Sequence, residues 1–176
     1  MKVMVGCIVL ATVLAMTAST RASDRPEPAT PEELGRLVIA SLSAQDTNAM
    51  AALCISLDEF KATFAGANRE GMYTQLMSRF VAAIPDAMAA LANAEFMSMD
   101  MRFVPEAHRT TGVPTQPGMD SGGITFKGET FTLDNVWVKV RVADKVRKVK
   151  LDAMVKVGKA WRLISGPVVK PEQPGK

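Results

Sequence analysis

The sequence predicts an α+β domain in which N-terminal helices pack on a curved antiparallel sheet of about four strands. Three observations lead to this prediction. Apolar residues recur at three- and four-residue steps between residues 31 and 94, which is the period of a helix packed on one face. From residue 96 onward apolar and polar residues alternate, which is the period of a half-buried strand. Helical patterns followed by a run of strand patterns are typical of an α+β layer arrangement.

The first 22 residues precede this domain as an apolar segment. Lys2 is followed by a mostly apolar run that ends at Ala18, which is short of the about 20 residues that a membrane-spanning helix needs. Small residues follow it. We predict a cleavable signal peptide over 1–22, with cleavage after Ala18, Thr20 or Ala22, rather than an uncleaved anchor. The protein is expected to be exported, to the periplasm or the extracellular space, and not to span the membrane after processing.

Export changes the charge balance and the cysteine count. The whole chain carries 21 Lys+Arg against 18 Asp+Glu. Removing residues 1–22 takes away Lys2 and Arg21 and no acid, which leaves 19 basic against 18 acidic side chains, so nucleic-acid binding is not expected. Processing also removes Cys7 and leaves Cys54 as the single cysteine, in an apolar helical stretch. We expect a buried, inert thiol there, and a core that is stable without a disulfide.

A single domain is expected over 31–168, after a flexible leader at 23–30 that is rich in proline. The first helix has a complete start signal. Thr30 is a good N-cap, Pro31 suits the first helical position, and Glu33 completes a capping box.

Two short helices should follow the first one. Asp46 is the expected N-cap of a helix from residue 47 to 54. Ser56 is the expected N-cap of the next helix, with Glu59 as its capping-box partner and Gly66 at its end.

The longest helix is expected over 70–94. Pro85 lies inside this pattern and lacks a backbone donor, so we expect a kink or a break there, with Asp86 capping the second piece. The helical pattern consists of Tyr73, Leu76, Met77, Phe80, Ile84, Met88 and Leu91.

The first strand is expected over 96–104, and a loop rich in proline, glycine and threonine over 105–123. In the strand, one face should carry Met97, Met99, Met101 and Phe103, and the other should carry Ser98, Asp100 and Arg102. Loops as long as the one over 105–123 are uncommon in compact domains and are either functional or disordered.

Three further strands complete the expected sheet. In the strand over 130–142 the valines at 136, 138, 140 and 142 share one face, and a bulge or bend is expected at residues 134–135, where the phase changes. The strand over 146–157 ends in a tight turn at residues 158–159, and Trp161 and Leu163 mark the last strand. Residues 169–176 are expected to be a disordered tail.

This order of elements resembles the nuclear-transport-factor-like superfamily, the cystatin-like α+β cone, over about residues 31–166. Three features carry the resemblance: a capped first helix followed by a short helix near Gln45-Asp46, a long helix before the first strand, and a closing hairpin that reads Val-Lys-Val-Gly-Lys-Ala-Trp-Arg-Leu-Ile over 155–164. The resemblance implies a curved sheet wrapped over helices, often around a pocket. Members of the superfamily include isomerases, dehydratases, cyclases and non-catalytic binding modules, so the resemblance indicates a fold rather than an activity.

Enzymes of that superfamily generally place an Asp, His or Tyr inside the cone. Here His108 and Tyr73 are the only residues of their types, and His108 lies in the expected loop. The cavity-lining residues that we predict are Tyr73, Met77, Phe80 and Met99. We predict no catalytic residues, no metal site and no cofactor.

Two patterns suggest chemistry and are better explained by structure. Residues 120–123 read Asp-Ser-Gly-Gly, as around a trypsin-like serine, but the helical chain upstream and the nearness of His108 favour a turn. Met97, Met99 and Met101 could ligate Cu(I), but a core stripe on a strand explains them better.

The C-terminal hairpins are basic. The alternation puts Trp137, Lys139 and Arg141 together on the polar face, which is either a solvated sheet face or an interaction surface. The whole basic set is Lys139, Arg141, Lys145, Arg147, Lys148, Lys150, Lys156, Lys159 and Arg162.

Three functional hypotheses follow. The first is an exported, non-catalytic binding or accessory domain for a small apolar ligand or an envelope protein partner. The second is a small lyase or isomerase that uses Asp100, Tyr73 or His108 in an apolar pocket. The third is a structural subunit of an envelope complex, which predicts a large exposed apolar patch.

Overall fold

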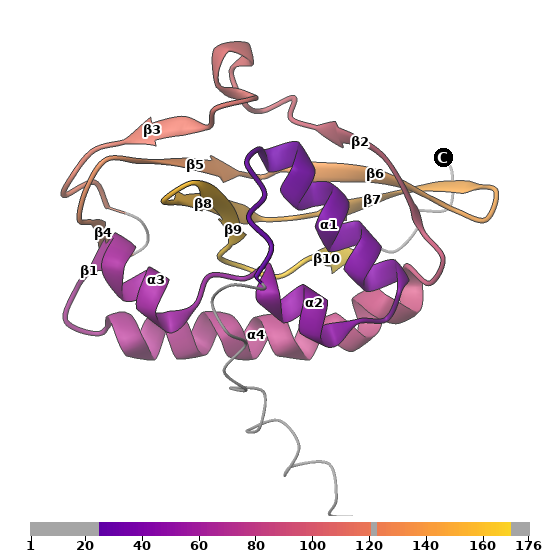
Figure 1. Cartoon of the computed structure of the whole chain (residues 1–176), viewed down its shortest axis with the longest axis horizontal. Helices are drawn as coiled ribbons and strands as arrows, with labels where there is room; N and C mark the ends of the chain where they lie inside the picture. Colours follow the sequence, from indigo (N-terminus) through magenta and orange to yellow (C-terminus); the bar gives the residue numbers. More distant parts are fainter. Residues whose placement is uncertain (1–24, 121–122, 170–176) are drawn as a thin grey trace, which may run out of the picture.

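The computed structural model describes residues 25–120 and 123–169, and its fold is α+β, as predicted (Figure 1). The signal peptide predicted over 1–22 and most of the predicted tail lie outside the described residues. Four helices come before the first long strand. They are α1 (Pro31–Ser43), α2 (Thr47–Ala52), α3 (Leu57–Thr63) and α4 (Arg69–Ala90).

The N-caps predicted at Thr30, Asp46 and Ser56 are confirmed, but only the second of the two predicted capping boxes forms. The Thr30 hydroxyl accepts a hydrogen bond from the Glu33 backbone N–H at 3.1 Å. In α3 the capping box is complete, because the Glu59 carboxylate also accepts the Ser56 backbone N–H at 2.8 Å. In α1 the Glu33 carboxylate instead accepts the backbone N–H of Ala29, at 2.8 Å. Caps depend only on neighbouring residues, which is why the sequence predicts them well.

Helix α4 runs without a break along one side of the sheets (Figure 1). Of the two alternatives predicted at Pro85, a kink or a break, the break is wrong, and so is the predicted cap at Asp86, because one helix spans both residues. Pro85 and Asp86 lie on the exposed side of the helix, while Ile84 and Ala87 beside them are buried in the core. Burial on this face holds the helix together across the missing backbone hydrogen bond.

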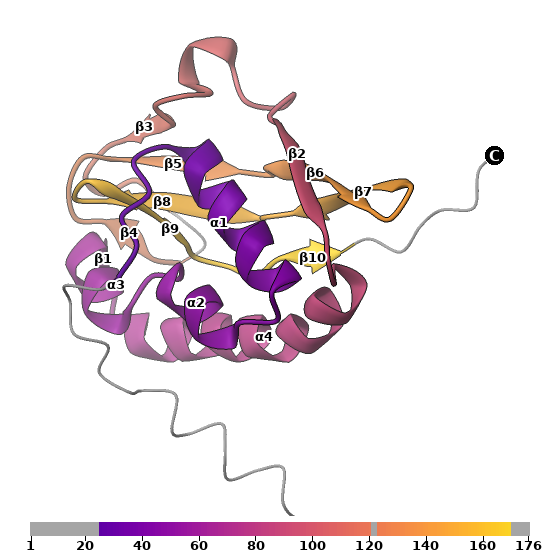
Figure 2. The same ribbon diagram turned by 45° about the vertical axis from the view of Figure 1, so that its right-hand side comes forward.

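Two four-stranded antiparallel sheets face these helices. One has the order β10-β7-β6-β2 and the other the order β3-β5-β8-β9, and β1 and β4 form a separate pair (Figure 2). The strands are β1 (Phe64–Ala65), β2 (Glu95–Asp100), β3 (Val113–Thr115), β4 (Thr125–Phe126), β5 (Thr130–Asp134), β6 (Trp137–Val142), β7 (Lys145–Lys150), β8 (Ala153–Val157), β9 (Ala160–Leu163) and β10 (Val168–Val169).

One bent hairpin connects the two sheets. Its first arm is β5 followed by β6, and its second arm is β7 followed by β8. The bend predicted at residues 134–135, in the first arm, is confirmed, since Asn135 has a φ of 55°. The predicted continuous strand over 146–157 is wrong, because Asp152, at a φ of 23°, divides it into β7 and β8. The two interruptions lie side by side: the Asn135 N–H donates to the Asp152 carbonyl at 2.7 Å. The sheet therefore bends in both arms at the same level.

The methionine stripe predicted for the first strand is not continuous. The register of β2 against β6 shifts between Phe96 and Ser98, so Met97 lies at a β-bulge and is 39 % exposed. Phe103, at the end of the predicted stripe, lies beyond β2 and is 71 % exposed. An inserted residue reverses the alternation of a strand, so Phe96 and Met99 share the inner face instead.

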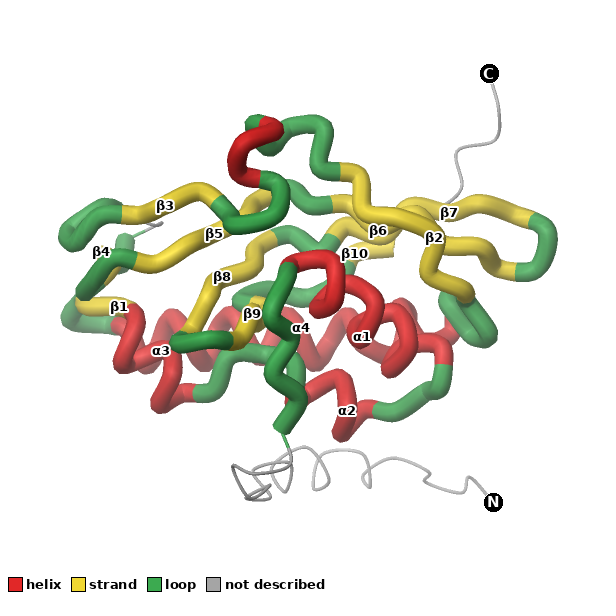
Figure 3. Tube along the Cα trace, turned by 45° about the horizontal axis from the view of Figure 1, so that its top comes forward, coloured by secondary structure: helices red, strands yellow, loops and turns green. Residues whose placement is uncertain are grey.

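The segment predicted as a long loop over 105–123 contains short elements within its described part. A 3₁₀ turn, η3 (Glu106–His108), is followed by β3, which pairs with β5 (Figure 3). Gly112, between them, has a φ of 85° and lies against the indole of Trp161.

Two apolar clusters form the core. The larger one joins α1, α2 and α4 to the sheets and includes Trp161, Leu133 and Met154, all fully buried. The smaller one lies around α3, β1 and β4 and includes Phe60 and Phe64, whose ring centroids are 4.7 Å apart.

Residues 25–30 differ from the flexible leader predicted over 23–30, because they are attached to the domain. Arg25 Nη1 pairs with Glu59 Oε2 at 2.6 Å, and Arg25 Nε donates to the Ala52 carbonyl at 2.8 Å. Arg162 Nε pairs with the other Glu59 oxygen at 3.1 Å and also donates, through Nη1, to the Pro26 carbonyl at 2.6 Å. These contacts form an ion network of Arg25, Glu59 and Arg162 that the sequence did not indicate.

Candidate functional site

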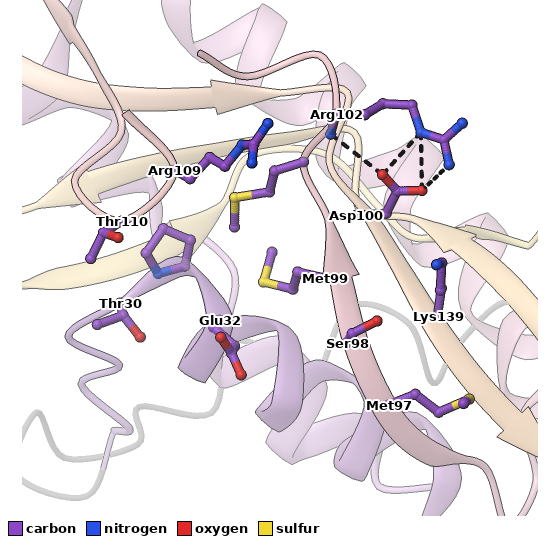
Figure 4. A pocket seen from close by; sticks show the side chains of 12 residues that line it. Thr30, Glu32, Met97, Ser98, Met99, Asp100, Arg102, Arg109, Thr110 and Lys139 are labelled. Atoms are coloured by element: carbon purple, nitrogen blue, oxygen red, sulfur yellow. Dashed lines mark hydrogen bonds and ion pairs between the residues drawn. The ribbon is translucent and has the colours of Figure 1, made fainter. Parts of the chain in front are cut away.

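The candidate site is a surface pocket of about 560 Å³ at the edge of the sheet formed by β2, β6, β7 and β10 (Figure 4). Its walls come from four parts of the chain: β2 with the turn after it, the start of α1, the residues just after η3, and β6. The residues that line it are Thr30, Pro31, Glu32, Met97, Ser98, Met99, Asp100, Met101, Arg102, Arg109, Thr110 and Lys139.

The pocket follows the open edge of β2. Six consecutive residues, Met97 to Arg102, line it, although side chains of neighbouring strand residues point to opposite faces. Residues that point to opposite faces of a strand can line one pocket only if the pocket lies along the edge of that strand. β2 pairs with β6 on one side and, within the described residues, with no strand on the other.

The inner side of this edge is apolar. Met99 pairs across the strands with Val138, which is fully buried, so both lie on the face toward the helices. The Met99 sulfur packs on Gly35 of α1 so closely that a Cβ at residue 35 would lie 3.2 Å from it. Nearby, the Arg36 guanidinium lies over the Phe96 ring, 4.3 Å from its centroid. Met99 and Met101 form the apolar wall of the pocket.

The outer side of the edge carries a neutralised carboxylate. Asp100 accepts hydrogen bonds from Arg102 Nε at 3.0 and 3.1 Å, and Lys148 Nζ lies 3.7 Å from Asp100 Oδ2. The hydrogen bonds from Arg102 lower the pKa of Asp100 to about 2, although burial acts in the opposite direction. Asp100 is therefore ionised and paired, and at neutral pH it holds no proton to donate.

Two cations of the pocket have no carboxylate partner within ion-pair distance among the described residues. Lys139 is paired across the strands with Ser98 on one side and with Lys148 on the other, so its nearest charged strand neighbour is another cation. Arg109 donates through Nε to the Val104 carbonyl at 3.2 Å, and its guanidinium contributes to the pocket wall. Both positions offer charge to an anionic group.

Trp137, Lys139 and Arg141 lie on the outer face of β6, because the valines that alternate with them are buried. Of these three predicted interaction residues, Lys139 also lines the pocket. Arg141 is exposed, and its Nη1 lies 3.5 Å from Glu95 Oε2 across the strands.

Not all members of the predicted basic set belong to this face. Lys156 and Lys159 lie on β8 and at its turn with β9, in the other sheet. Arg162 is buried in the ion network with Glu59. Arg147 pairs across the strands with the buried Val140 and donates to the Ala90 carbonyl, at the C-terminal end of α4, at 3.3 Å. A cation there complements the helix dipole and the unpaired carbonyls of the last turn.

The four residues predicted to line a cavity lie in different places. Met99 lines the surface pocket. Phe80 is buried in the larger core cluster, and Met77 packs against that cluster. Tyr73 belongs to the smaller cluster, with its ring 5.4 Å from that of Phe60 and its hydroxyl donating to the Ile55 carbonyl at 3.3 Å.

The three residues of the lyase hypothesis do not meet. Asp100 lies on β2, Tyr73 on α4 and His108 on η3, and of these only Asp100 lines the pocket. Burial raises the pKa of Tyr73, which keeps its phenol protonated. Ser121 of the Asp-Ser-Gly-Gly sequence lies outside the described residues. Within the described ranges, no group of three or more His, Cys, Asp and Glu side chains could hold a metal ion.

Sequence reasoning did not find the wall of the pocket contributed by Thr30, Pro31 and Glu32, nor the one contributed by Arg109 and Thr110. These residues reach β2 only through the packing of α1 and the turn after β2, and no local signal marks them.

None of the helices in the described ranges has both the length and the hydropathy that crossing a bilayer requires. No protein-family model, no curated protein and no solved structure matches this chain.

Proposed function

We propose that this protein is an exported, non-catalytic binding domain of the cystatin-like cone type, which binds a protein partner through the β2 edge pocket and the adjoining outer face of β6 and β7. The observation that carries the proposal is the unneutralised charge of Lys139 and Arg109 beside an open strand edge. By contrast, Arg141 and Lys148 on the same face each have a carboxylate within ion-pair distance, Glu95 and Asp100 respectively.

The packing of the interior favours a protein partner over a stored apolar ligand. Large side chains, among them Trp161, Leu133 and Met154, are fully buried between the helices and the sheets. The pocket lies at the surface, and its wall combines thioethers with charged groups. Native mass spectrometry of the exported protein is expected to give the mass of the bare chain, and a reproducible added mass of a small molecule would contradict this part of the proposal.

The distribution of exposed apolar side chains does not favour a purely structural subunit. The most exposed large ones do not come from one helix or strand, since Phe103 and Met119 lie outside all helices and strands and Val146 and Val168 lie on β7 and β10. A subunit interface of an obligate complex would need a contiguous apolar patch.

Site-specific photo-crosslinking in the exporting cell tests the proposal. A benzophenone amino acid at position 141, on the outer face, is expected to give a discrete crosslinked product. The matched control is position 79, where Arg79 is exposed on α4 away from the pocket. Equal crosslinking at both positions, or none at position 141, would refute the outer face as a binding surface.

A further inference from the structure

We infer that the segment recognised at the pocket is an extended peptide that alternates acidic and apolar residues and adds as a strand to the open edge of β2. This inference rests on the proposed function, because it names the chemistry of the protein partner. The proposed occupant of the β2 edge is a peptide strand, not a second copy of this chain or a lipid surface.

The edge of β2 is available for pairing. Every second backbone N–H and C=O of an edge strand points away from the sheet. Within the described residues, those of 95–100 make no backbone hydrogen bond beyond their pairing with β6. Unpaired strand edges bind extended peptides because the main chain then supplies much of the affinity.

The pocket provides room along this edge. Its volume of about 560 Å³ is bordered by consecutive residues of one strand rather than by one face of it. The start of α1, at Thr30 and Pro31, and the segment at Arg109 and Thr110 form its far walls (Figure 4). A strand placed between these walls and β2 would lie in the plane of the sheet.

The two faces of the edge determine the side chains of such a strand. On the inner face, the added strand would meet the thioethers of Met99 and Met101, which adapt to varied apolar partners. On the outer face it would meet Ser98, the Asp100 carboxylate that Arg102 neutralises and, one strand further, Lys139 (Figure 4). Because strand side chains alternate between faces, a matching peptide alternates apolar and acidic residues.

The charges favour an acidic peptide. Lys139 lies between Ser98 and Lys148 in the cross-strand row, and like charges directly opposite each other are unfavourable. A carboxylate above Ser98 would relieve this repulsion. Arg109, at the loop end of the pocket, would accept a second carboxylate.

The bulge at Met97 limits the length of the pairing. A bulge ends regular pairing on an edge, so the added strand should pair along residues 98–100, where β2 ends. Three residues of pairing with two charge contacts predict a weak, salt-sensitive complex rather than a tight one.

The probe for this inference is an acetylated and amidated eight-residue peptide of alternating valine and glutamate, with a fluorescent label. Fluorescence anisotropy of the exported protein with this peptide at low salt is expected to show saturable binding. A peptide of alternating valine and lysine is the charge control. A peptide of the same composition in two blocks, four valines then four glutamates, is the pattern control. Binding by either control as tight as by the alternating acidic peptide would overturn the inference.

Backbone methylation distinguishes strand addition from charge attraction alone. An added strand presents one of its edges to β2, and alternate N–H groups lie on that edge. N-methylation of one alternate set of residues should therefore abolish binding, while methylation of the other set leaves it within about twofold of the parent peptide. Equal binding of both methylated peptides would refute pairing with the edge.

The charge of Lys139 is tested in the protein. Lys139→Glu should weaken binding of the alternating acidic peptide about tenfold or more. The matched control is Lys159→Glu, which makes the same charge change at the β8–β9 turn, on the other sheet. Equal affinity of the two variants would contradict the inference.

Other occupants give distinct results. Concentration-dependent dimers in sedimentation velocity without peptide binding would assign the edge to a second copy. Flotation with phosphatidylglycerol vesicles, lost in Lys139→Glu, without peptide binding would assign it to a lipid surface. Both results overturn the inference. Failure of the peptide experiments together with crosslinking at position 141 would refute the strand and leave the protein partner in place.

Discussion

Replacing Glu59 by glutamine tests the ion network that attaches residues 25–30 to the domain. The Glu59 carboxylate pairs with Arg25 through one oxygen and with Arg162 through the other. The side chains of Arg25 and Arg162 are 18 % and 5 % exposed, so water compensates little when the carboxylate is lost. Glutamine can keep the capping bond to Ser56 with its single oxygen. Its amide NH₂ would then face a guanidinium, donor against donor.

The expected cost is about 2–4 kcal/mol of unfolding free energy. Breaking a buried ion pair by removing one partner costs about 3–5 kcal/mol, and the lower range applies because the Glu59 side chain keeps 21 % exposure. For a chain of this length, that is a fall in Tm of between about 4 and 16 °C. Thermal unfolding followed by circular dichroism measures it. Arg25→Met should cost less, because Arg162 remains paired with Glu59.

The matched control is Glu32→Gln, which breaks the exposed pair between Glu32 and Arg36 at 2.7 Å on α1. Exposed pairs four residues apart on a helix contribute only about 0.3–0.5 kcal/mol. If Glu59→Gln lowers the Tm no more than Glu32→Gln does, the network does not stabilise the fold and the reasoning fails.

Further predictions concern pH, a glycine and the cysteine. Burial raises the pKa of Glu59, but hydrogen bonds from Ser56 and the two arginines lower it more, so it lies below its ordinary value of 4.5. The stabilisation by the Glu59 carboxylate is therefore present above pH 4.5 and is lost as the pH falls through the folded-state pKa. The difference in unfolding free energy between wild type and Glu59→Gln, measured by urea unfolding, should therefore narrow below pH 4.5. In the same assay, Gly112→Ala should lower the unfolding free energy by about 1–3 kcal/mol more than Gly118→Ala does. Both glycines have a positive φ, but only at Gly112 would the new Cβ meet the Trp161 ring, at 2.5 Å. Equal losses in the two variants would contradict this prediction. Burial raises the pKa of the Cys54 thiol, which leaves it unreactive in the native protein. After iodoacetamide treatment at pH 8, peptide mapping should find Cys54 alkylated in unfolded protein but not in native protein. Rapid labelling of the native protein would disprove the burial of Cys54.

Local signals in the sequence predict local structure well. The N-caps at Thr30, Asp46 and Ser56 are all present, because a cap requires only the next three residues. The two-residue turn at 158–159 is present for the same reason, with Gly158 at a φ of 60°.

Patterns that depend on pairing are predicted less well. The alternation over 96–104 indicates a strand, but the bulge that moves Met97 out of phase arises from pairing with β6. Likewise, the interruption at Asp152 has no glycine or proline to mark it, and it accompanies the bend of the opposite arm at Asn135. Both irregularities are set by the partner strand rather than by the residues themselves.

The candidate site shows the same division. Alternation alone places Lys139 on the polar face, and the buried valines beside it confirm that placement. The sequence could not show that β2 ends the sheet, because strand order is a property of the whole fold. It also could not show that Arg109 approaches β2 with no carboxylate within ion-pair distance among the described residues.

By itself, the sequence determined the α+β class, the helix starts and the faces of β6, because each follows from periodicity or from contacts within one turn. The tertiary structure decided three things: which strand edge stays open, which cations are neutralised, and that residues 25–30 are held through Glu59 and Arg162. Each of these depends on groups far apart in the chain, the last on an ion pair across 103 residues. Spacing along a sequence carries no information about such pairs until packing brings them together.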